Sequence, residues 1–579
     1  MHLLSFSVLS IPLIHAACYD PSPFFPLPLW PHGSRTLAPA FSSIAKHLDD
    51  ILAKEKYNTS SLSLSITSQT DTLWSYSHTA RIQNTTRPGD QHVDEDSLYR
   101  IASITKTFTV LALLQQARAG NLSLDDPVLA YIPELTSPGY VLPWKDVTLR
   151  SLASQLSGLP REFAQADLLN EVPDPSLFGL PILSEEEKEK LPTCYEYADH
   201  RTPCNRTELL SGLKGRKPVF APNARSTYSN LAFELLGLVI ANVSGRTYEE
   251  YIQNAIFDLI DMPSSRFLAP KSDEKSVLPL GQYFFDVDEG VHNPTGGIFS
   301  TSRDLSAYLR FVLTHFNALA VGVNWLLPGS FAAGAGSFYG MPWEIFSTEK
   351  VVRGRRTTFV TKGGGVPMYF SKILLLPEYG LGITTLTGGD VGLVGEVNEV
   401  VTVGLVRAAE EAVVEDVRGR YAGSYAFEGK GMGETGMQLS VKEGKGLVLE
   451  SLVVNDTDVF ATLLPIYAGA AAGGEWRAQL LPTLLFKDEA AQAGEIFRIV
   501  VVPERSAKGK EEETVWEEFC ITDVDPASYG GVPINEVVYW HEAGKEGEMV
   551  VELSAWRVNM SAVNTGDRVW KGGVRVQSV

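Results

Sequence analysis

The four residues Ser103-Ile-Thr-Lys106 constrain the fold of this chain more than any other segment, because they open a long apolar stretch. The residues that follow, through Leu114, have the pattern of a buried helix that Gly120 is expected to end. Residues three apart share one face of a helix, so Lys106 is expected to project beside Ser103. A serine hydroxyl needs a neighbour to take its proton, and a lysine amine can do so when burial lowers its pKa. Ser103 is therefore the candidate nucleophile.

The same Ser-x-x-Lys spacing recurs elsewhere in the chain, so the spacing by itself indicates little. A single match of this kind is more often an ordinary pair on the surface of a helix. The apolar helix distinguishes the match at Ser103. The other matches lie in polar or loop-like stretches or beside the amino terminus: Ser43–Lys46, Ser211–Lys214, Ser272–Lys275 and Ser347–Lys350.

Two further motifs lie downstream. Tyr228-Ser-Asn230 is the only Tyr-x-Asn in the chain, and it opens a second helical stretch over residues 231–241. Lys362-Gly-Gly-Gly365 lies between two strand-like runs, residues 356–361 and 371–376. A tyrosine between cations can be drawn toward phenolate and act as a base. A lysine and glycines on a strand edge can bind a carboxylate and offer a backbone N–H to an oxyanion.

In this order, the three motifs resemble those of the serine β-lactamase and penicillin-binding protein superfamily. The tyrosine points to the branch that contains class C β-lactamases, D-amino-acid peptidases and related esterases. The resemblance implies an α+β catalytic domain, with an antiparallel sheet flanked by helices and a helical subdomain. It covers roughly residues 41–410 and includes shorter landmarks in their usual order, at residues 120–128, 130–134, 156–160, 248–251 and 296–305.

The resemblance implies a serine hydrolase that works through an acyl-enzyme on an ester, amide or peptide. Ser103 would attack a carbonyl carbon, and Lys106 and Tyr228 would transfer the protons. Asn230 would orient the substrate or Lys106.

The third motif implies the groups that bind substrate and oxyanion. Lys362 would stabilise the Tyr228 phenolate or bind an anionic group of the substrate. Backbone N–H groups of Ser103 and Gly365 would form the oxyanion hole, with Gly364 in the same substrate-binding motif.

Two residues depart from the pattern of the resembled family, and one segment is added to it. Gly363 supplies no hydroxyl where Thr or Ser usually follows the lysine, so we expect weak recognition of a β-lactam carboxylate. Gln155 stands where many relatives have a histidine. Residues 161–220 form an insertion that is expected to line or cover the entrance of the site. We therefore expect small esters or amides to acylate Ser103 better than β-lactams do.

Two other functions remain open at this level. An acyltransferase on the same site would use a bound alcohol or amine in place of water, and added nucleophiles would then intercept the acyl-enzyme faster than hydrolysis. A non-catalytic binding protein could keep the fold, but such a protein is expected to lose a motif. Here only the middle residue of the third motif, Gly363, has changed.

The amino terminus predicts a secreted, extracellular protein. Residues 1–17 form a short apolar run that ends in small residues, as in a signal peptide. No later stretch is apolar enough to span a membrane. Sequons for N-glycosylation are spread along the chain and support secretion. They lie at Asn58, Asn84, Asn121, Asn205, Asn242, Asn455 and Asn559.

Four cysteines follow this run, and four cysteines allow three pairings between which sequence cannot choose. Loop closure favours the nearby pair Cys194–Cys204 within the insertion, which leaves Cys18 to pair with Cys520.

Charge and missing motifs exclude several classes of function. Lys and Arg number 49 against 69 Asp and Glu, a net charge of −20 that argues against nucleic acid or an anionic membrane surface as a partner. No His-Glu-x-x-His, paired Cys-x-x-Cys or Gly-x-Ser-x-Gly occurs, so neither a zinc enzyme nor an α/β-hydrolase is supported. We expect a small-molecule or peptide substrate and no metal or other cofactor. The oligomeric state cannot be predicted.

Proline content and hydrophobic periodicity divide the chain into successive parts. Residues 18–40 are rich in proline and are expected to form an extended arm. Residues 41–415 are the predicted catalytic domain, closed by a long amphipathic helix over 396–417. In residues 420–579, short alternating runs between Gly, Asp, Asn and Lys clusters predict antiparallel strands. Because Tyr421-Ala-Gly-Ser-Tyr425 resembles the entry to a lipocalin-like barrel that some relatives append, we expect an all-β lipocalin-like domain there.

Overall fold

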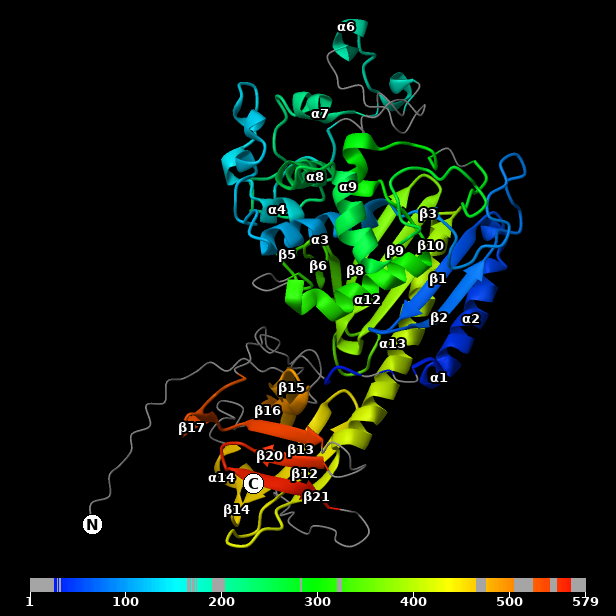
Figure 1. Cartoon of the computed structure of the whole chain (residues 1–579). Helices are drawn as coiled ribbons and strands as arrows, with labels where there is room; N and C mark the ends of the chain where they lie inside the picture. The colour runs from blue at the N-terminus through cyan, green and yellow to red at the C-terminus, as the bar shows by residue number, and fades with distance from the viewer. Residues whose placement is uncertain are drawn as a thin grey trace. The chain divides into compact units, whose positions relative to one another are not determined.

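The computed structural model describes residues 25–28, 30, 33–163, 168, 172, 174–189, 204–281, 284–319, 325–464, 475–504, 524–541 and 549–563. They form two compact units, both drawn in Figure 1. The first unit comprises Trp30–Thr348 and Thr357–Val406. The second consists mainly of residues 407–563, together with Glu349–Arg356.

An antiparallel sheet of eight strands forms the centre of the first unit, in the order β2-β1-β10-β9-β8-β7-β6-β5. Strands from the two ends of the unit lie side by side in it, because Leu62 on β1 pairs with Thr387 on β10. All residues of β1 are buried, whereas the edge strand β2 is partly exposed. The strands are β1 Ser61–Thr67, β2 Thr72–His78, β5 Ser330–Phe331, β6 Ser337–Tyr339, β7 Glu344–Thr348, β8 Thr357–Val366, β9 Tyr369–Leu376 and β10 Leu381–Gly388.

Helices cover both faces of this sheet (Figure 1). On β10, Thr385 hydrogen-bonds Asn398 of α13 (Gly392–Tyr421) at 3.1 Å. On the same strand, a side chain at Gly382 would meet Leu309 of α12 (Ser302–Leu319) at 3.1 Å. Residues an odd number apart on a strand point to opposite faces, so α12 and α13 lie on opposite sides of the sheet.

A helical subdomain is built around α3 (Thr105–Arg118), which is buried nearly all round. It packs against α8 (Leu231–Ser244), and as predicted it ends just before Gly120, whose φ is 75°. The short strands β3 Tyr99–Arg100 and β4 Phe299–Ser300 pair with each other, and β3 contacts β9 and β10 of the sheet. The remaining α-helices in the described part of the unit are α1 Gly33–Thr36, α2 Ala38–Leu52, α4 Leu149–Ala153, α6 Glu185–Lys188, α7 Arg206–Gly212, α9 Tyr248–Ile252, α10 Asp258–Ile260 and α11 Asn293–Gly296.

The second unit contains an antiparallel barrel. Strand β12 pairs with both β11 and β13, so eight strands close on themselves and leave no free edge between them. The Tyr539 ring lies 4.9 Å from that of Tyr421 and 5.0 Å from that of Phe497. The predicted all-β, lipocalin-like domain is thus confirmed. Its elements are β11 Gly423–Ala426, β12 Gly436–Lys442, β13 Gly446–Val454, β14 Thr457–Asp458, α14 Val459–Thr462, β15 Trp476–Asp488, β16 Ala493–Pro503, β17 Ser528–Tyr529, β18 Val532–Pro533, β19 Glu536–His541, β20 Met549–Leu553 and β21 Val558–Ala562.

The structure corrects two local expectations. The predicted extended arm is helical in its last part, because α1 and the start of α2 lie within residues 33–40. Pro39 occupies the first turn of α2, where its missing N–H leaves no hydrogen bond unmade. The helix predicted over 396–417 is longer and runs from Gly392 to Tyr421.

Several predictions fall outside the described residues. These are the signal peptide over 1–17 and the cysteines Cys18, Cys194 and Cys520. Cys204 is buried and disulfide-bonded. Its partner lies outside the described residues, so the pairing with Cys194 stays a prediction.

Candidate active site

Ser103 lies in a 3-10 turn, Ala102–Ile104, that leads into α3. Ala102 has a φ of 47°, in the left-handed region that residues with a Cβ rarely adopt. From β9, Ser371 Oγ donates a hydrogen bond to the carbonyl oxygen of Ile101 at 2.8 Å and so holds the turn. The Ser103 side chain is left partly exposed at the start of an otherwise buried helix.

The amine of Lys106 lies beside the Ser103 hydroxyl, as the helical spacing predicts. Its Nζ donates to Ser103 Oγ at 3.0 Å and to the carbonyl oxygen of Thr295, in α11, at 2.8 Å. Lys106 is fully buried, and this burial lowers its pKa, although Tyr228 acts in the opposite direction. The nucleophile and a proton-transfer group are therefore in hydrogen-bonding contact.

Tyr228 lies between two ammonium groups. The Nζ atoms of Lys106 and Lys362 are each 5.2 Å from the centroid of its ring. The guanidinium of Arg161 lies 4.8 Å from the same centroid. Burial favours the neutral phenol, but Lys106 and Lys362 outweigh it and lower the pKa of Tyr228 to about 8. The phenolate is thus accessible near neutral pH, which a general base requires.

Gln155 fixes the backbone on both sides of Tyr228. Its carbonyl oxygen accepts from the N–H of Thr227 at 2.9 Å, and its side-chain Oε1 accepts from the N–H of Ser229 at 2.7 Å. Gln155 is buried and has a φ of 61°. The residue that departs from the family pattern therefore helps to position the candidate base.

Lys362 is held by a carboxylate that sequence reasoning missed. Its Nζ donates to Glu344 Oε1 at 2.6 Å, and the N–H of Gly363 donates to Glu344 Oε2 at 3.0 Å. Lys362 is buried, which disfavours its ammonium, but Tyr228 and Glu344 outweigh this effect and raise the pKa of Lys362. Lys362 therefore remains a cation beside Tyr228.

The glycines of the third motif let β8 approach the Ser103 turn. A Cβ at Gly364 would lie 2.2 Å from the carbonyl oxygen of Ile101 and 3.1 Å from the backbone nitrogen of Ser103. Such a contact is too short, so only glycine fits there. At Gly365 the nearest atom to a Cβ would be 3.5 Å away, on Phe370. The strand that carries Gly364 and Gly365 thus lies directly against the backbone of the candidate nucleophile.

Asn230 stands at the N-cap position of α8 without making a side-chain capping hydrogen bond, and it contacts another residue that was missed, Glu162. Its Nδ2 donates to Glu162 Oε1, and its Oδ1 has no hydrogen-bond partner in the described part of the chain. Glu162 and Arg161 directly follow the landmark at 156–160, and this position was the only sequence signal that pointed to them.

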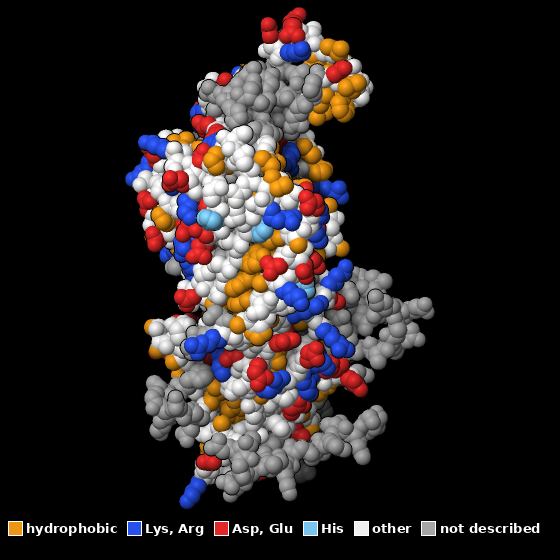
Figure 2. Space-filling model, turned by 90° about the vertical axis from the view of Figure 1, so that its right-hand side faces the viewer, with side chains coloured by type: hydrophobic (Ala, Val, Ile, Leu, Met, Phe, Trp, Pro, Cys, Tyr) orange, Lys and Arg blue, Asp and Glu red, His pale blue; other side chains and the backbone are white. Residues whose placement is uncertain are grey.

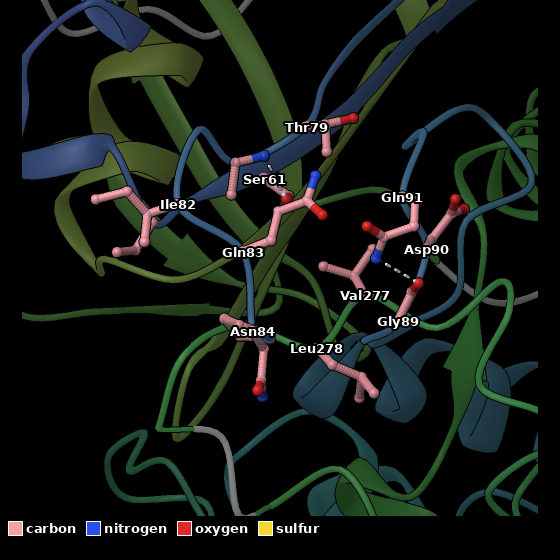
Figure 3. A pocket seen from close by; sticks show the side chains of 13 residues that line it. Ser61, Thr79, Ile82, Gln83, Asn84, Gly89, Asp90, Gln91, Val277 and Leu278 are labelled. Atoms are coloured by element: carbon pink, nitrogen blue, oxygen red, sulfur yellow. Dashed lines mark hydrogen bonds between the residues drawn. The ribbon is translucent and has the colours of Figure 1, made fainter. Parts of the chain in front are cut away.

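None of the seven sequon asparagines is buried. Asn84 also lines a pocket on the first unit, together with Ser61, Thr79 and Gln83 (Figure 3). In it, the Ser61 hydroxyl accepts a backbone N–H and Gln91 donates to the carbonyl oxygen of Gly89. None of the predicted catalytic or substrate-binding residues lines this pocket.

Part of the insertion carries exposed apolar side chains. Within residues 174–189, Leu177 is 79% exposed, Phe178 67% and Ile182 74%. Hydrophobic and acidic side chains lie close together around α6 in Figure 2. This part of the insertion is not packed into the core of the unit.

Neither a metal-binding cluster nor a membrane-spanning helix is found among the residues that the structure describes. Across the described ranges, no three His, Cys, Asp or Glu side chains are grouped so that they could hold a metal ion. Within the same ranges, no helix has the length and apolar character needed to cross a membrane.

The family models and relatives that this chain matches agree with the family indicated by the order of its three motifs. The family model described as "Beta-lactamase" matches residues 44–401, and the model described as "Beta-lactamase-like-like, C-terminal domain" matches residues 413–564. "Probable hydrolase M10" from Phoma sp. is 30% identical over 93% of this chain and 90% of its own length. "Probable hydrolase clz13" from Cochliobolus lunatus is 30% identical over 96% of this chain and 94% of its own length.

Solved structures are more distant. The octameric penicillin-binding protein homologue from Pyrococcus abyssi is 18% identical, with a TM-score of 0.48, over 90% of this chain and 99% of its own. A class C β-lactamase in complex with cefoxitin is 18% identical, with a TM-score of 0.47, over 64% of this chain and 99% of its own. Because the "Beta-lactamase" model covers well over half of its residues, this chain belongs to the β-lactamase family.

Proposed function

We propose that this chain is a serine hydrolase that forms an acyl-enzyme at Ser103 and acts on esters, amides or small peptides. One observation carries the proposal: Lys106 Nζ contacts Ser103 Oγ at 3.0 Å, while Tyr228 lies between Lys106 and Lys362. Relatives that share about the full length of the chain are named probable hydrolases, which supports hydrolysis as the reaction.

The reaction would proceed in two steps. Ser103 Oγ bonds to the carbonyl carbon while its proton passes to the pair Lys106 and Tyr228, and the pair then gives the proton to the departing alcohol or amine. Water next attacks the acyl-enzyme, and its proton returns through the same pair to Ser103. In both steps the N–H groups of Ser103 and Gly365 would stabilise the oxyanion.

Neutral or small substrates suit this site better than β-lactams. In the third motif, the backbone N–H of Gly363 and the ammonium of Lys362 are already bound to the carboxylate of Glu344. Gly363 adds no hydroxyl with which to hold a second carboxylate. The motif therefore offers few free donors to an anionic substrate.

The proposal is tested by covalent labelling. A fluorophosphonate probe should add one label to the protein, detected by intact mass, and Ser103→Ala should abolish it. Ser272→Ala is the matched control, because Ser272 has the same spacing to a lysine but lies in an exposed loop. Labelling that survives Ser103→Ala would show that the proposed nucleophile is wrong.

We also propose that the protein is secreted as a glycoprotein. The apolar run over residues 1–17, the seven exposed or partly exposed sequons and the disulfide-bonded Cys204 all suit a secreted glycoprotein. Expression in a eukaryotic secretory host should release a protein whose mass falls after treatment with an N-glycosidase. Peptide mapping without reductant should recover Cys194 joined to Cys204.

A further inference from the structure

Glu162 is a nearly buried carboxyl group to which the reaction above gives no role. Its side chain is 11% exposed. Oε1 accepts from Asn230 Nδ2, and the Nε of Arg161 lies 3.4 Å from the same oxygen. A carboxylate taken out of water this far is retained only where charged or polar partners hold it.

The backbone around Glu162 is fixed to the start of α8. The carbonyl oxygen of Arg161 accepts from the N–H groups of Asn230 at 2.8 Å and Leu231 at 3.2 Å. The Arg161 side chain lies over the Tyr228 ring. Glu162 therefore belongs to the same rigid cluster as the candidate base.

The groups that face Glu162 come from three elements and differ in charge. Lys106 comes from α3, Arg161 from the loop of Glu162 itself, Glu234 from α8 and Asn230 from the position just before α8. Glu234 in turn hydrogen-bonds His292 at 2.7 Å. Burial and Glu234 raise the pKa of Glu162 to about 7, although Asn230, Lys106 and Arg161 lower it. Glu162 is thus a carboxyl group that changes its charge near neutral pH.

We propose that Glu162 is a positioning residue for the acyl-enzyme reaction, which is active when Glu162 is ionised and impaired when it is protonated. The inference rests on the proposed function. An ionised carboxylate binds the Asn230 amide more strongly than a neutral acid does. Its negative charge also favours the ammonium form of Lys106, and that ammonium is what stabilises the Tyr228 phenolate.

The variant Glu162→Gln separates charge from shape. A glutamine oxygen can still accept from Asn230 Nδ2, so the variant should fold. Its side chain is neutral at every pH, as protonated Glu162 is, so its kcat/KM should lie below that of the native protein above pH 7. In the native protein, kcat/KM for an activated ester should fall below pH 7 because both Glu162 and Tyr228 become protonated. In the variant only Tyr228 becomes protonated. The ratio of variant to native kcat/KM should therefore be lowest above pH 7 and rise toward one below it, by up to about tenfold per pH unit.

The matched control is Glu134→Gln, the same change in an exposed ion pair with Arg206. It should keep the native pH profile. A purely structural role of Glu162 would instead lower kcat/KM by one factor at every pH. A pH-independent ratio between Glu162→Gln and the native protein would therefore overturn the inference.

A second measurement does not depend on activity. Infrared difference spectra recorded across a pH titration should contain a carboxyl band that changes near pH 7 and is missing only in Glu162→Gln. A band that persists in this variant also overturns the inference. If Ser103→Ala keeps full esterase activity, the proposed function fails instead, and the infrared band still decides whether Glu162 ionises as inferred.

Discussion

Glu344 and Lys362 form a tight ion pair across neighbouring strands, with Glu344 Oε1 2.6 Å from Lys362 Nζ. The pair is bridged to the backbone, because the other carboxylate oxygen accepts the N–H of Gly363. The same lysine faces the ring of Tyr228. Any change in the charge of this pair should therefore shift the pKa of Tyr228, the candidate base.

The first prediction follows from the sign of that effect. The negative charge of Glu344 raises the pKa of Tyr228, so Glu344→Gln should lower it below its value of about 8. Because Tyr228 must be deprotonated to act as a base, its ionisation on the acid side of the kcat/KM profile should move to lower pH, by roughly one unit. Tyrosinate absorbance, titrated in this variant and in the native protein, should show the same displacement. An upward displacement would contradict the assigned role of Glu344.

The second prediction concerns the cation. Lys362 lowers the pKa of Tyr228, so Lys362→Met should raise it. At pH 7, kcat/KM should fall about tenfold for each unit by which the pKa rises, and raising the pH should restore part of the loss. Lys362→Arg keeps the charge and is the control. If raising the pH restores no activity to Lys362→Met, Lys362 acts mainly on the substrate and not on Tyr228.

The sequence predicted best what depends on local structure. Lys106 contacts Ser103 because it lies three positions further along the turn that leads into α3, and α3 begins where the apolar stretch begins. The antiparallel strands of the second unit were likewise evident from short alternating runs, whereas the barrel was predicted from the resemblance of residues 421–425 to the entry of a lipocalin-like domain. Proline at the start of α2 was misread, because proline favours both extended chain and the first turn of a helix.

Contacts between distant segments could not be predicted in the same way. Glu344 reaches Lys362 only because β7 pairs with β8 in the register that sets Glu344 opposite Thr361. Gln155 contacts Ser229 across 74 residues of chain. Such contacts depend on strand register and on the packing of loops, which no local pattern specifies.

The third prediction compares two neighbouring glycines of β8. A Cβ at position 364 would lie 2.2 Å from the Ile101 carbonyl oxygen, whereas one at position 363 would lie no closer than 3.5 Å to Glu344. Gly364→Ala should therefore lower the free energy of unfolding by about 1–3 kcal/mol and displace the turn that carries Ser103. Gly363→Ala, the control, should change it by less than about 1 kcal/mol. Chemical denaturation and the rate of fluorophosphonate labelling measure the two effects. Equal losses in both variants would contradict the close approach of β8 to Ser103.

The last prediction concerns substrate choice at Gly363. A side chain placed there would extend toward the carboxylate of Glu344, beside Lys362. Gly363→Thr adds a hydroxyl that can donate to a substrate carboxylate, a hydrogen bond worth roughly 1.5–3 kcal/mol when charge-assisted. Acylation of Ser103 by a cephalosporin should therefore rise about ten- to more than a hundredfold, while acylation by a small neutral ester changes little. Gly363→Ala fills the same space without the hydroxyl and should not show the gain. If the native protein hydrolyses cephalosporins more efficiently than any tested ester, or if Gly363→Ala gains as much as Gly363→Thr, the missing hydroxyl does not set the substrate preference.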